Sequence, residues 1–229
     1  MNKTLLETVK LKKTYDHKNG IINLFDNVNI KIKRGDLVAL VGPSGSGKSS
    51  FLHLLALLDD PTKGKILLKN KDTKNFSDEE KDQARKNNVS IIFQDNNLLT
   101  DFTALENVIM PLIIRGEKSI SAIEKTNKIL KEVKIFNRKS HFPNEMSGGE
   151  QQRTAIARAL VAETDLILAD EPTGNLDYKT SEDIFSYFLK LKKLNKAVIF
   201  ATHNRELANK ADYKLSISRG NIKRTNGPS

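Results

Sequence analysis

Residues 37–50, LVALVGPSGSGKSS, constrain the fold more than any other part of this sequence. A short apolar run, typical of a buried strand, leads into a glycine-rich loop, and the loop leads into an apolar pattern typical of a helix. Residues 42–49 match the pattern G-x-x-x-x-G-K-S/T, whose backbone N–H groups surround phosphates when the loop joins a strand to a helix. The segment therefore predicts an α/β domain that binds a nucleoside triphosphate.

The residue types in this loop fit that chemistry. Gly42, Gly45 and Gly47 allow backbone conformations and close approaches that a side chain would block. Lys48 can reach the β- and γ-phosphates, and the Ser49 hydroxyl can bind Mg²⁺. We expect the whole run to contact ATP: Gly42, Pro43, Ser44, Gly45, Ser46, Gly47, Lys48, Ser49 and Ser50.

Further apolar runs, rich in Val, Ile and Leu, are typical of strands buried on both faces, which indicates a mainly parallel sheet. They are residues 89–93, 166–170 and 197–202. Residues 22–33 instead alternate apolar and polar side chains, which predicts an antiparallel sheet with one wet face.

A helical pattern lies between the second and third of the core strands. Residues 119–135 begin with serines that can cap a helix. Their spacing puts a set of apolar side chains near one face: Ile123, Ile129, Leu130 and Val133. A second helix is expected after Ser147.

Two carboxylates end the run 166–170 and begin the loop after it. Asp170 can hold Mg²⁺ opposite Ser49. Glu171, which is not a metal ligand in this arrangement, can polarise the water that attacks the γ-phosphate. We therefore expect Glu171 to be the general base of a hydrolase.

Two other polar residues follow core strands at the same sheet edge. A neutral imidazole of His203 could accept a proton from the water or hold Glu171 and the phosphate in register, and a structural role is the open alternative. The Gln94 amide oxygen could contact Mg²⁺ or the attacking water. The predicted catalytic residues are Glu171, His203 and Gln94, and the predicted Mg²⁺ ligands are Ser49, Gln94 and Asp170.

A second glycine-rich helix start occurs at residues 147–150, SGGE. Ser147 and Glu150 have the spacing of a capping box. The two glycines between them leave the helix N-terminus bare enough for a phosphate to dock on its amides. Because the first loop already surrounds the phosphates of a bound nucleotide, we expect the second to face a nucleotide held by another copy of the chain.

The phosphate loop, Gln94, SGGEQ (147–151), LILADEPTGNLD (166–177) and His203, in this order and spacing, resemble the ATP-binding subunits of ABC transporters. The resemblance covers essentially the whole chain. It implies an ATPase with that family's fold: a P-loop core with a mainly parallel sheet, an N-terminal antiparallel β subdomain and an inserted helical subdomain.

The resemblance also implies a division of the chain. Residues 1–229 are expected to form a single ABC ATP-binding domain. Within it, residues 1–93 and 163–229 form the nucleotide-binding core with the β subdomain, and residues 94–162 form the helical subdomain.

A head-to-tail dimer follows from the same resemblance. It implies that Tyr15 stacks on adenine. It also implies residues that contact the partner's ATP: Ser147, Gly148, Gly149, Glu150 and Asp177. The chain departs from the common family pattern at three positions: Met146 replaces Leu, Glu150 replaces Gln, and Asn204 replaces an Asp after the histidine.

Residues 96–113, NNLLTDFTALENVIMPLI, resemble the same segment in the ATPases of bacterial lipoprotein-releasing complexes. The resemblance implies a homodimer that powers release of lipoproteins from the inner membrane toward a periplasmic carrier. Integral membrane subunits would dock near residues 94–113. The alternatives are the ATPase of a macrolide or peptide exporter, and a non-transporting cell-division ATPase that regulates a membrane partner.

Composition bears on the partners and on location. The net charge of +10 is spread along the chain without a run of like charges or interleaved aromatics, so we expect no nucleic-acid partner. No apolar stretch approaches the roughly 20 residues of a membrane span, and residues 1–10 lack the layout of a secretion signal. Cysteine is absent, which suits a reducing compartment. We expect a peripheral protein on the cytoplasmic face of the inner membrane.

Overall fold

A six-stranded sheet forms the centre of the computed structural model, which describes residues 3–18, 20–174 and 176–226. Its strand order is β10-β9-β3-β8-β7-β6. The strands are β3 (Leu37–Val41), β6 (Val89–Ile92), β7 (Leu166–Asp170), β8 (Ala197–Ala201), β9 (Tyr213–Ser218) and β10 (Asn221–Asn226). All neighbours pair in parallel except β9 and β10, which form an antiparallel pair. The predicted mainly parallel sheet is therefore confirmed, and every residue of β7 and β8 is buried.

A second, antiparallel sheet has the order β2-β1-β4-β5. Its strands are β1 (Thr4–His17), β2 (Gly20–Lys33), β4 (Lys63–Leu68) and β5 (Lys71–Asp72). The alternation read in residues 22–33 places Phe25, Val28, Ile30 and Ile32 on the buried face. The N-terminal antiparallel sheet was thus predicted correctly from its period of two.

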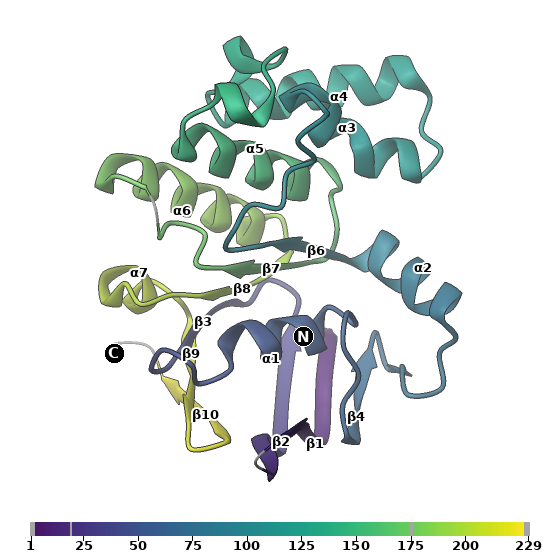
Figure 1. Cartoon of the computed structure of the whole chain (residues 1–229), viewed down its shortest axis with the longest axis vertical. Coiled ribbons are helices and arrows are strands. Elements are labelled where there is room, and N and C mark those ends of the chain that lie inside the picture. Colours follow the sequence, from purple (N-terminus) through teal and green to yellow (C-terminus); the bar gives the residue numbers. More distant parts are fainter. Residues whose placement is uncertain (1–2, 19, 175, 227–229) are drawn as a thin grey trace.

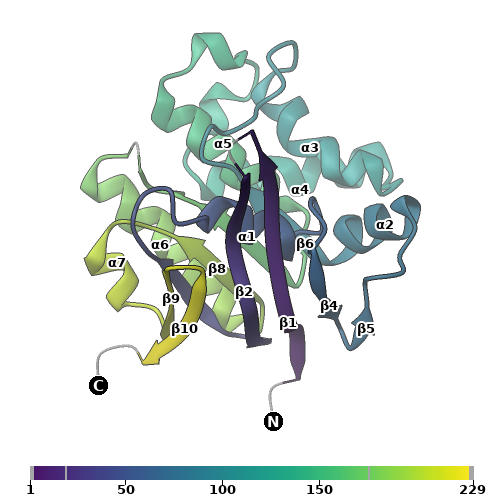
Figure 2. The same ribbon diagram turned by 60° about the horizontal axis from the view of Figure 1, so that its bottom comes forward.

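Helices cover both faces of the six-stranded sheet (Figure 1). They are α1 (Lys48–Leu55), α2 (Asp78–Asn88), α3 (Ala104–Ile114), α4 (Ser119–Glu132), α5 (Gly148–Val161), α6 (Tyr178–Lys193) and α7 (Arg205–Asn209), with short 3₁₀ helices η1 (Phe136–Arg138) and η2 (Pro143–Glu145). Helix α1 lies between the two sheets and buries Phe51, Leu52, Leu54 and Leu55 completely. Figure 2, in which the antiparallel sheet comes forward, shows α1 behind β1 and β2.

The other face of the central sheet packs against α5, α6 and α7; α3 packs on α5, and α4 packs on α3 and α5. This core is separate from the one that contains α1. Among the described residues, no helix is both long enough and apolar enough to cross a membrane.

Helix α4 corrects two details of the prediction. Its N-cap is Lys118 without a side-chain hydrogen bond, so Ser119 is the first helical residue and does not cap the helix. Ile123 is 42% exposed, because the helix turns Ala122, Thr126 and Leu130 toward the core instead. Leu130 and Val133 are buried as expected.

Asn107 on α3 holds the loop before that helix. Its side chain is fully buried, and its Oδ1 accepts from the Leu99 amide at 2.8 Å. Its Nδ2 donates to the carbonyls of Leu99 (3.0 Å), Phe102 (2.9 Å) and Thr103 (3.1 Å). One side chain therefore replaces the backbone pairing that this irregular loop lacks.

We predict that Asn107→Ala lowers the free energy of unfolding by about 2–3 kcal/mol, because it leaves buried backbone groups without partners. Urea unfolding measures the loss. Asn137→Ala, at an exposed position in η1, is the control and should stay within about 0.5 kcal/mol of wild type. A loss below about 1 kcal/mol for Asn107→Ala would contradict this role.

Candidate functional site

The loop between β3 and α1 has a shape that only glycine permits at two of its positions. A Cβ on Gly42 would lie 2.8 Å from Ser46 Oγ and 2.9 Å from the Ile217 carbonyl oxygen. Gly47 has a φ of +93°, and a Cβ there would lie 2.8 Å from Leu24 Cδ1. The tight curl that turns backbone amides inward is therefore tied to these two residues.

Lys48, the first residue of α1, folds back over this loop. It is 8% exposed, and its Nζ donates to the carbonyls of Gly42 (3.1 Å) and Pro43 (3.2 Å). The same Nζ lies 3.3 Å from His203 Nε2. Ser46 Oγ is buried nearby without a hydrogen-bond partner. A confined cation beside an unpaired hydroxyl fits an anionic oxygen, so the residues present suit a phosphate.

Glu171 follows β7 in a strained conformation. Its φ is +45°, in the left-handed region, and its amide donates to the Ala201 carbonyl at 3.1 Å. The side chain is 14% exposed. Its Oε2 accepts weakly from the His203 amide at 3.4 Å, and its Oε1 lies 3.2 Å from His203 Nε2 without the alignment of a hydrogen bond. A buried carboxylate oxygen is thus left free to accept from water.

The surroundings of Glu171 alter its proton affinity. Burial raises the pKa of this carboxyl above its ordinary value, and the neighbouring charge of Asp170 acts in the same direction. His203 and Lys48 oppose the shift without cancelling it. A carboxylate with a raised pKa is a stronger base, which is the property that water activation requires.

Each of the three predicted Mg²⁺ ligands offers an oxygen atom, and each comes from a different part of the fold. Ser49 lies in the first turn of α1, Asp170 is the buried last residue of β7, and Gln94 is exposed in the loop after β6. Within the described ranges, no group of three or more His, Cys, Asp or Glu side chains could hold a metal by itself. This set fits Mg²⁺, which takes oxygen ligands and binds through one or two carboxylates together with phosphate oxygens and water.

Tyr15, near the end of β1, is fixed by two residues that were not predicted from the sequence. Its hydroxyl donates to Asp59 Oδ2 at 2.7 Å, and Lys13 Nζ lies 4.6 Å from its ring centroid. Lys13 also donates to Asp59 Oδ1 at 2.6 Å. Burial, followed by the contact with Asp59, raises the pKa of Tyr15. The ring is 39% exposed and can offer a surface for stacking.

The second glycine-rich helix start forms the expected capping box. Ser147 Oγ accepts from the Glu150 amide at 3.3 Å, and Glu150 Oε2 accepts from the Ser147 amide at 2.8 Å. A Cβ on Gly148 would meet nothing within 4 Å, so this end of α5 is bare. Because α1 and α5 cover opposite faces of the central sheet, the two glycine-rich starts lie in separate layers (Figure 1).

Two further residues in this region are helix caps. Asp177 caps α6: its Oδ1 accepts from the Thr180 amide at 2.9 Å and its Oδ2 from the Thr180 hydroxyl at 2.6 Å. Asn204 caps α7, where its Oδ1 accepts from the amides of Glu206 (2.9 Å) and Leu207 (3.1 Å). The Asn that stands here in place of the common Asp therefore acts as a helix cap.

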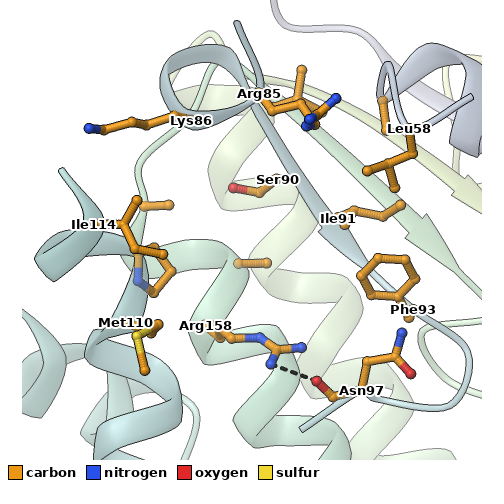
Figure 3. A pocket seen from close by; sticks show the side chains of 15 residues that line it. Leu58, Arg85, Lys86, Ser90, Ile91, Phe93, Asn97, Met110, Ile114 and Arg158 are labelled. Atoms are coloured by element: carbon orange, nitrogen blue, oxygen red, sulfur yellow. Dashed lines mark hydrogen bonds between the residues drawn. The ribbon is translucent and has the colours of Figure 1, made fainter. Parts of the chain in front are cut away.

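A groove of about 380 Å³ lies between β6, the loop after it, α3 and α5. Figure 3 shows Ile91 and Phe93 on one wall and Met110 and Ile114 on the opposite wall. Arg158 of α5 donates to the carbonyls of Asn97 and Asn96, each at 2.8 Å. The groove thus adjoins both the loop that carries Gln94 and the helix that begins with SGGE.

Comparison with known proteins gives consistent results. Residues 25–174 match the family described as ABC transporter. The chain is 44% identical over 218 residues to the lipoprotein-releasing system ATP-binding protein LolD of Rickettsia bellii, which covers 94% of this chain and 96% of that protein. It is 42% identical over 223 residues to LolD of Legionella pneumophila, with 97% and 98% covered.

Solved structures agree. A dimeric ATP-binding cassette in a post-hydrolysis state, bound to ADP and phosphate, is 35% identical with a TM-score of 0.94, over 98% of this chain and all of that one. A nucleotide-free ATP-binding cassette from an ABC transporter is 25% identical with a TM-score of 0.82, over 98% of this chain and 92% of that one. The fold is that of an ATP-binding cassette.

We predict that Glu171→Gln raises the midpoint of thermal unfolding at about pH 7.5. Burial raises the pKa of Glu171, so the folded state favours its protonated form over its ionised form. The stability that this preference contributes is fully present below the unfolded-state pKa and is lost as pH rises through the folded-state pKa. A neutral Gln keeps that contribution at every pH.

The difference from wild type should therefore vanish in acid, and differential scanning fluorimetry across pH measures it. Glu124→Gln, on the exposed face of α4, is the control and should show no such pH-dependent difference. If Glu171→Gln were less stable than wild type at neutral pH, burial of the ionised Glu171 carboxylate would not be destabilising, and the prediction would be wrong.

Proposed function

Because the chain belongs to the ABC transporter family of ATP-binding subunits, we propose that it drives release of lipoproteins from the inner membrane toward a periplasmic carrier. The chain is an ATPase whose hydrolysis is coupled to transport. One observation carries the finer assignment: relatives 42–44% identical over nearly their whole length are named as the ATP-binding protein of a lipoprotein-releasing system.

ATP would bind along the loop 42–50 with its adenine on Tyr15. Gly42 and Gly47 keep the loop curled so that its amides face the phosphates. Lys48, now bonded to two loop carbonyls, would exchange them for β- and γ-phosphate oxygens. Asp59 and Lys13 keep the Tyr15 ring from turning, which lowers the entropy cost of stacking.

Hydrolysis would depend on Glu171 and its neighbours. Mg²⁺, held by Ser49 and Asp170 with the Gln94 amide oxygen, supplies charge neutralisation at the phosphates when bound. Glu171 Oε1, buried and without a hydrogen bond, accepts from the attacking water and orients it. His203, between Glu171 and Lys48, keeps these two side chains in register with the γ-phosphate.

Two copies would complete each site head to tail. Ser147, Gly148 and Gly149, with Glu150 closing the capping box, would receive the γ-phosphate of the partner's ATP on the bare end of α5, and Asp177 would line the seam. A dimeric relative with bound ADP and phosphate supports this arrangement. The layer separation of α1 and α5 also supports it, because the two glycine-rich starts belong to different layers of one copy.

The groove of Figure 3 would receive integral membrane subunits, at the predicted position near residues 94–113. Its apolar walls suit a short helix from such a subunit. Arg158 ties the carbonyls of Asn96 and Asn97 to α5, so a shift of the loop carrying Gln94 would move the SGGE helix too. We propose that residues 94–162 form the helical subdomain that moves in this way. The protein itself would be peripheral, on the cytoplasmic face of the inner membrane.

We predict that Gly148→Ala abolishes ATP-driven dimerisation while ATP binding by the single chain is unchanged. The added methyl meets open space within the chain, so folding is unaffected, but it would occupy the place of the partner's phosphate. Hydrolysis should fall at least about tenfold.

Sedimentation of the Gly148→Ala variant in a Glu171→Gln background, with saturating Mg-ATP, measures the dimer. Ser119→Ala, at the same first helical position of α4, is the control and should behave as wild type. Normal turnover by Gly148→Ala would contradict the shared site.

The lipoprotein assignment is tested by purifying tagged Glu171→Gln protein from its native membranes with Mg-ATP and identifying what accompanies it. Integral membrane proteins with large periplasmic domains, together with bound lipoprotein, are the expected result. A partner of the cell-division type would leave the ATPase in place and overturn the lipoprotein assignment.

The docking surface is tested in the same purification. Ile114→Glu puts a charge in the groove and should lose the membrane partner. Ile120→Glu, on the exposed start of α4 outside the groove, is the matched control and should retain it. Equal retention by both variants would place the membrane partner elsewhere.

A further inference from the structure

Arg138 and Glu150 form an ion pair beside the start of α5. Arg138, the last residue of η1, donates from Nε to Glu150 Oε1 at 2.8 Å. The other oxygen, Oε2, accepts from the amide and the hydroxyl of Ser147 at 2.8 Å and 3.1 Å. Both carboxylate oxygens of Glu150 are therefore held, one by a cation and one by the residue that begins the SGGE helix.

This carboxylate lies in the first turn of the helix on which the partner's phosphate is proposed to dock. A helix N-terminus carries roughly +0.5 elementary charge, which favours phosphate. A full negative charge within the first turn opposes that field. Hydrogen bonding to the Ser147 amide, helped by the nearby Arg138, lowers the pKa of Glu150 and keeps it ionised. The family's Gln would bring no such charge, so this chain has a repulsion that a Gln-bearing relative lacks.

The surrounding groups leave Arg138 as the compensating charge. His141 Nε2 lies 3.3 Å from Arg138 NH1, a different nitrogen from the Nε that bonds Glu150. Glu145 is the carboxylate nearest to Glu150 in the sequence. It accepts from the Phe142 amide at 2.8 Å and caps η2. Among the described residues, Arg138 is the one cation paired with Glu150.

The Ser147 hydroxyl is affected as well. Because an ionised carboxylate only accepts, the hydroxyl proton of Ser147 points to Glu150 Oε2 and is not available to a phosphate. Arg138 competes for the same carboxylate from its other oxygen. Because the two donors share one negative charge, the bond from Arg138 weakens Oε2 as an acceptor for the Ser147 hydroxyl, which is then more easily exchanged to an incoming anion.

We propose that Arg138 is a positioning residue for the shared site: it neutralises and holds Glu150 so that the N-terminus of α5 can accept the partner's nucleotide. The proposal rests on the head-to-tail dimer proposed above. It adds Arg138, which lies outside the SGGE sequence, to the residues that prepare the site for the partner's nucleotide. It also explains how the chain functions with Glu150 in place of Gln.

The test is a double-mutant cycle in the full chain. Arg138→Gln, Glu150→Gln and the double variant are made in a Glu171→Gln background, and the Mg-ATP concentration that gives half-maximal dimer is measured by sedimentation. Arg138→Gln should raise it about tenfold, whereas in the Glu150→Gln background the same change should have less than about a twofold effect. Binding of ATP to the single chain should be unchanged throughout.

Two controls separate the possible outcomes. Lys139→Gln removes the adjacent cation, which lies over the Phe136 ring, and should not affect dimer formation. An equal loss from Arg138→Gln in both Glu150 backgrounds would show a merely structural role and overturn the proposal, as would no loss in either background. If Gly148→Ala dimerises normally, the shared site itself is wrong, and that result is distinct from failure of the Arg138 cycle alone.

Discussion

The parallel register of three central strands determines where the chemistry can take place. Leu40 of β3 and Asp170 of β7 both pair with Ala201 of β8, so the three strands end level with one another. The phosphate loop begins two residues after Leu40, Glu171 directly follows Asp170, and His203 lies two residues after Ala201. Residues more than 100 positions apart in the sequence therefore meet at one sheet edge, where buried, closely packed strands position them.

The site at this edge is held in conformations that cost free energy. Glu171 has a left-handed backbone and a buried oxygen without a hydrogen bond, and Ser46 Oγ is also unpaired. Such features cost about 1–3 kcal/mol each and persist where the surrounding structure leaves no alternative. The fully buried strands β7 and β8 provide that surrounding structure. The same strained arrangement leaves these polar atoms without partners inside the protein, so that they can hydrogen-bond to water and phosphate. In a relaxed site, they would be paired with protein groups.

Local sequence signals predicted much of this. The apolar runs identified β3, β6, β7 and β8 to within a residue, because strands buried on both faces need no partner-specific pattern. The edge strand β6 departs from that expectation, since Val89 and Ile91 are only partly buried. The capping box at Ser147 was predicted because its hydrogen bonds lie within four residues of chain. Helix α4 was predicted as a helix, but not its rotation, since the choice between Ala122 and Ile123 depends on how closely α3 and α5 approach it.

The sequence by itself determined the strands, the phosphate loop and the residue types available for hydrolysis, because each depends on neighbours along the chain. Only the tertiary structure decided which distant groups control them. Asp59 holds Tyr15 across 44 positions, and Arg158 holds the loop at Asn97 across 61. Arg138 reaches Glu150 only because η1 and η2 fold back against the start of α5. These contacts have no signature in the sequence, because a hydrogen bond between separate elements depends on packing geometry and not on spacing along the chain.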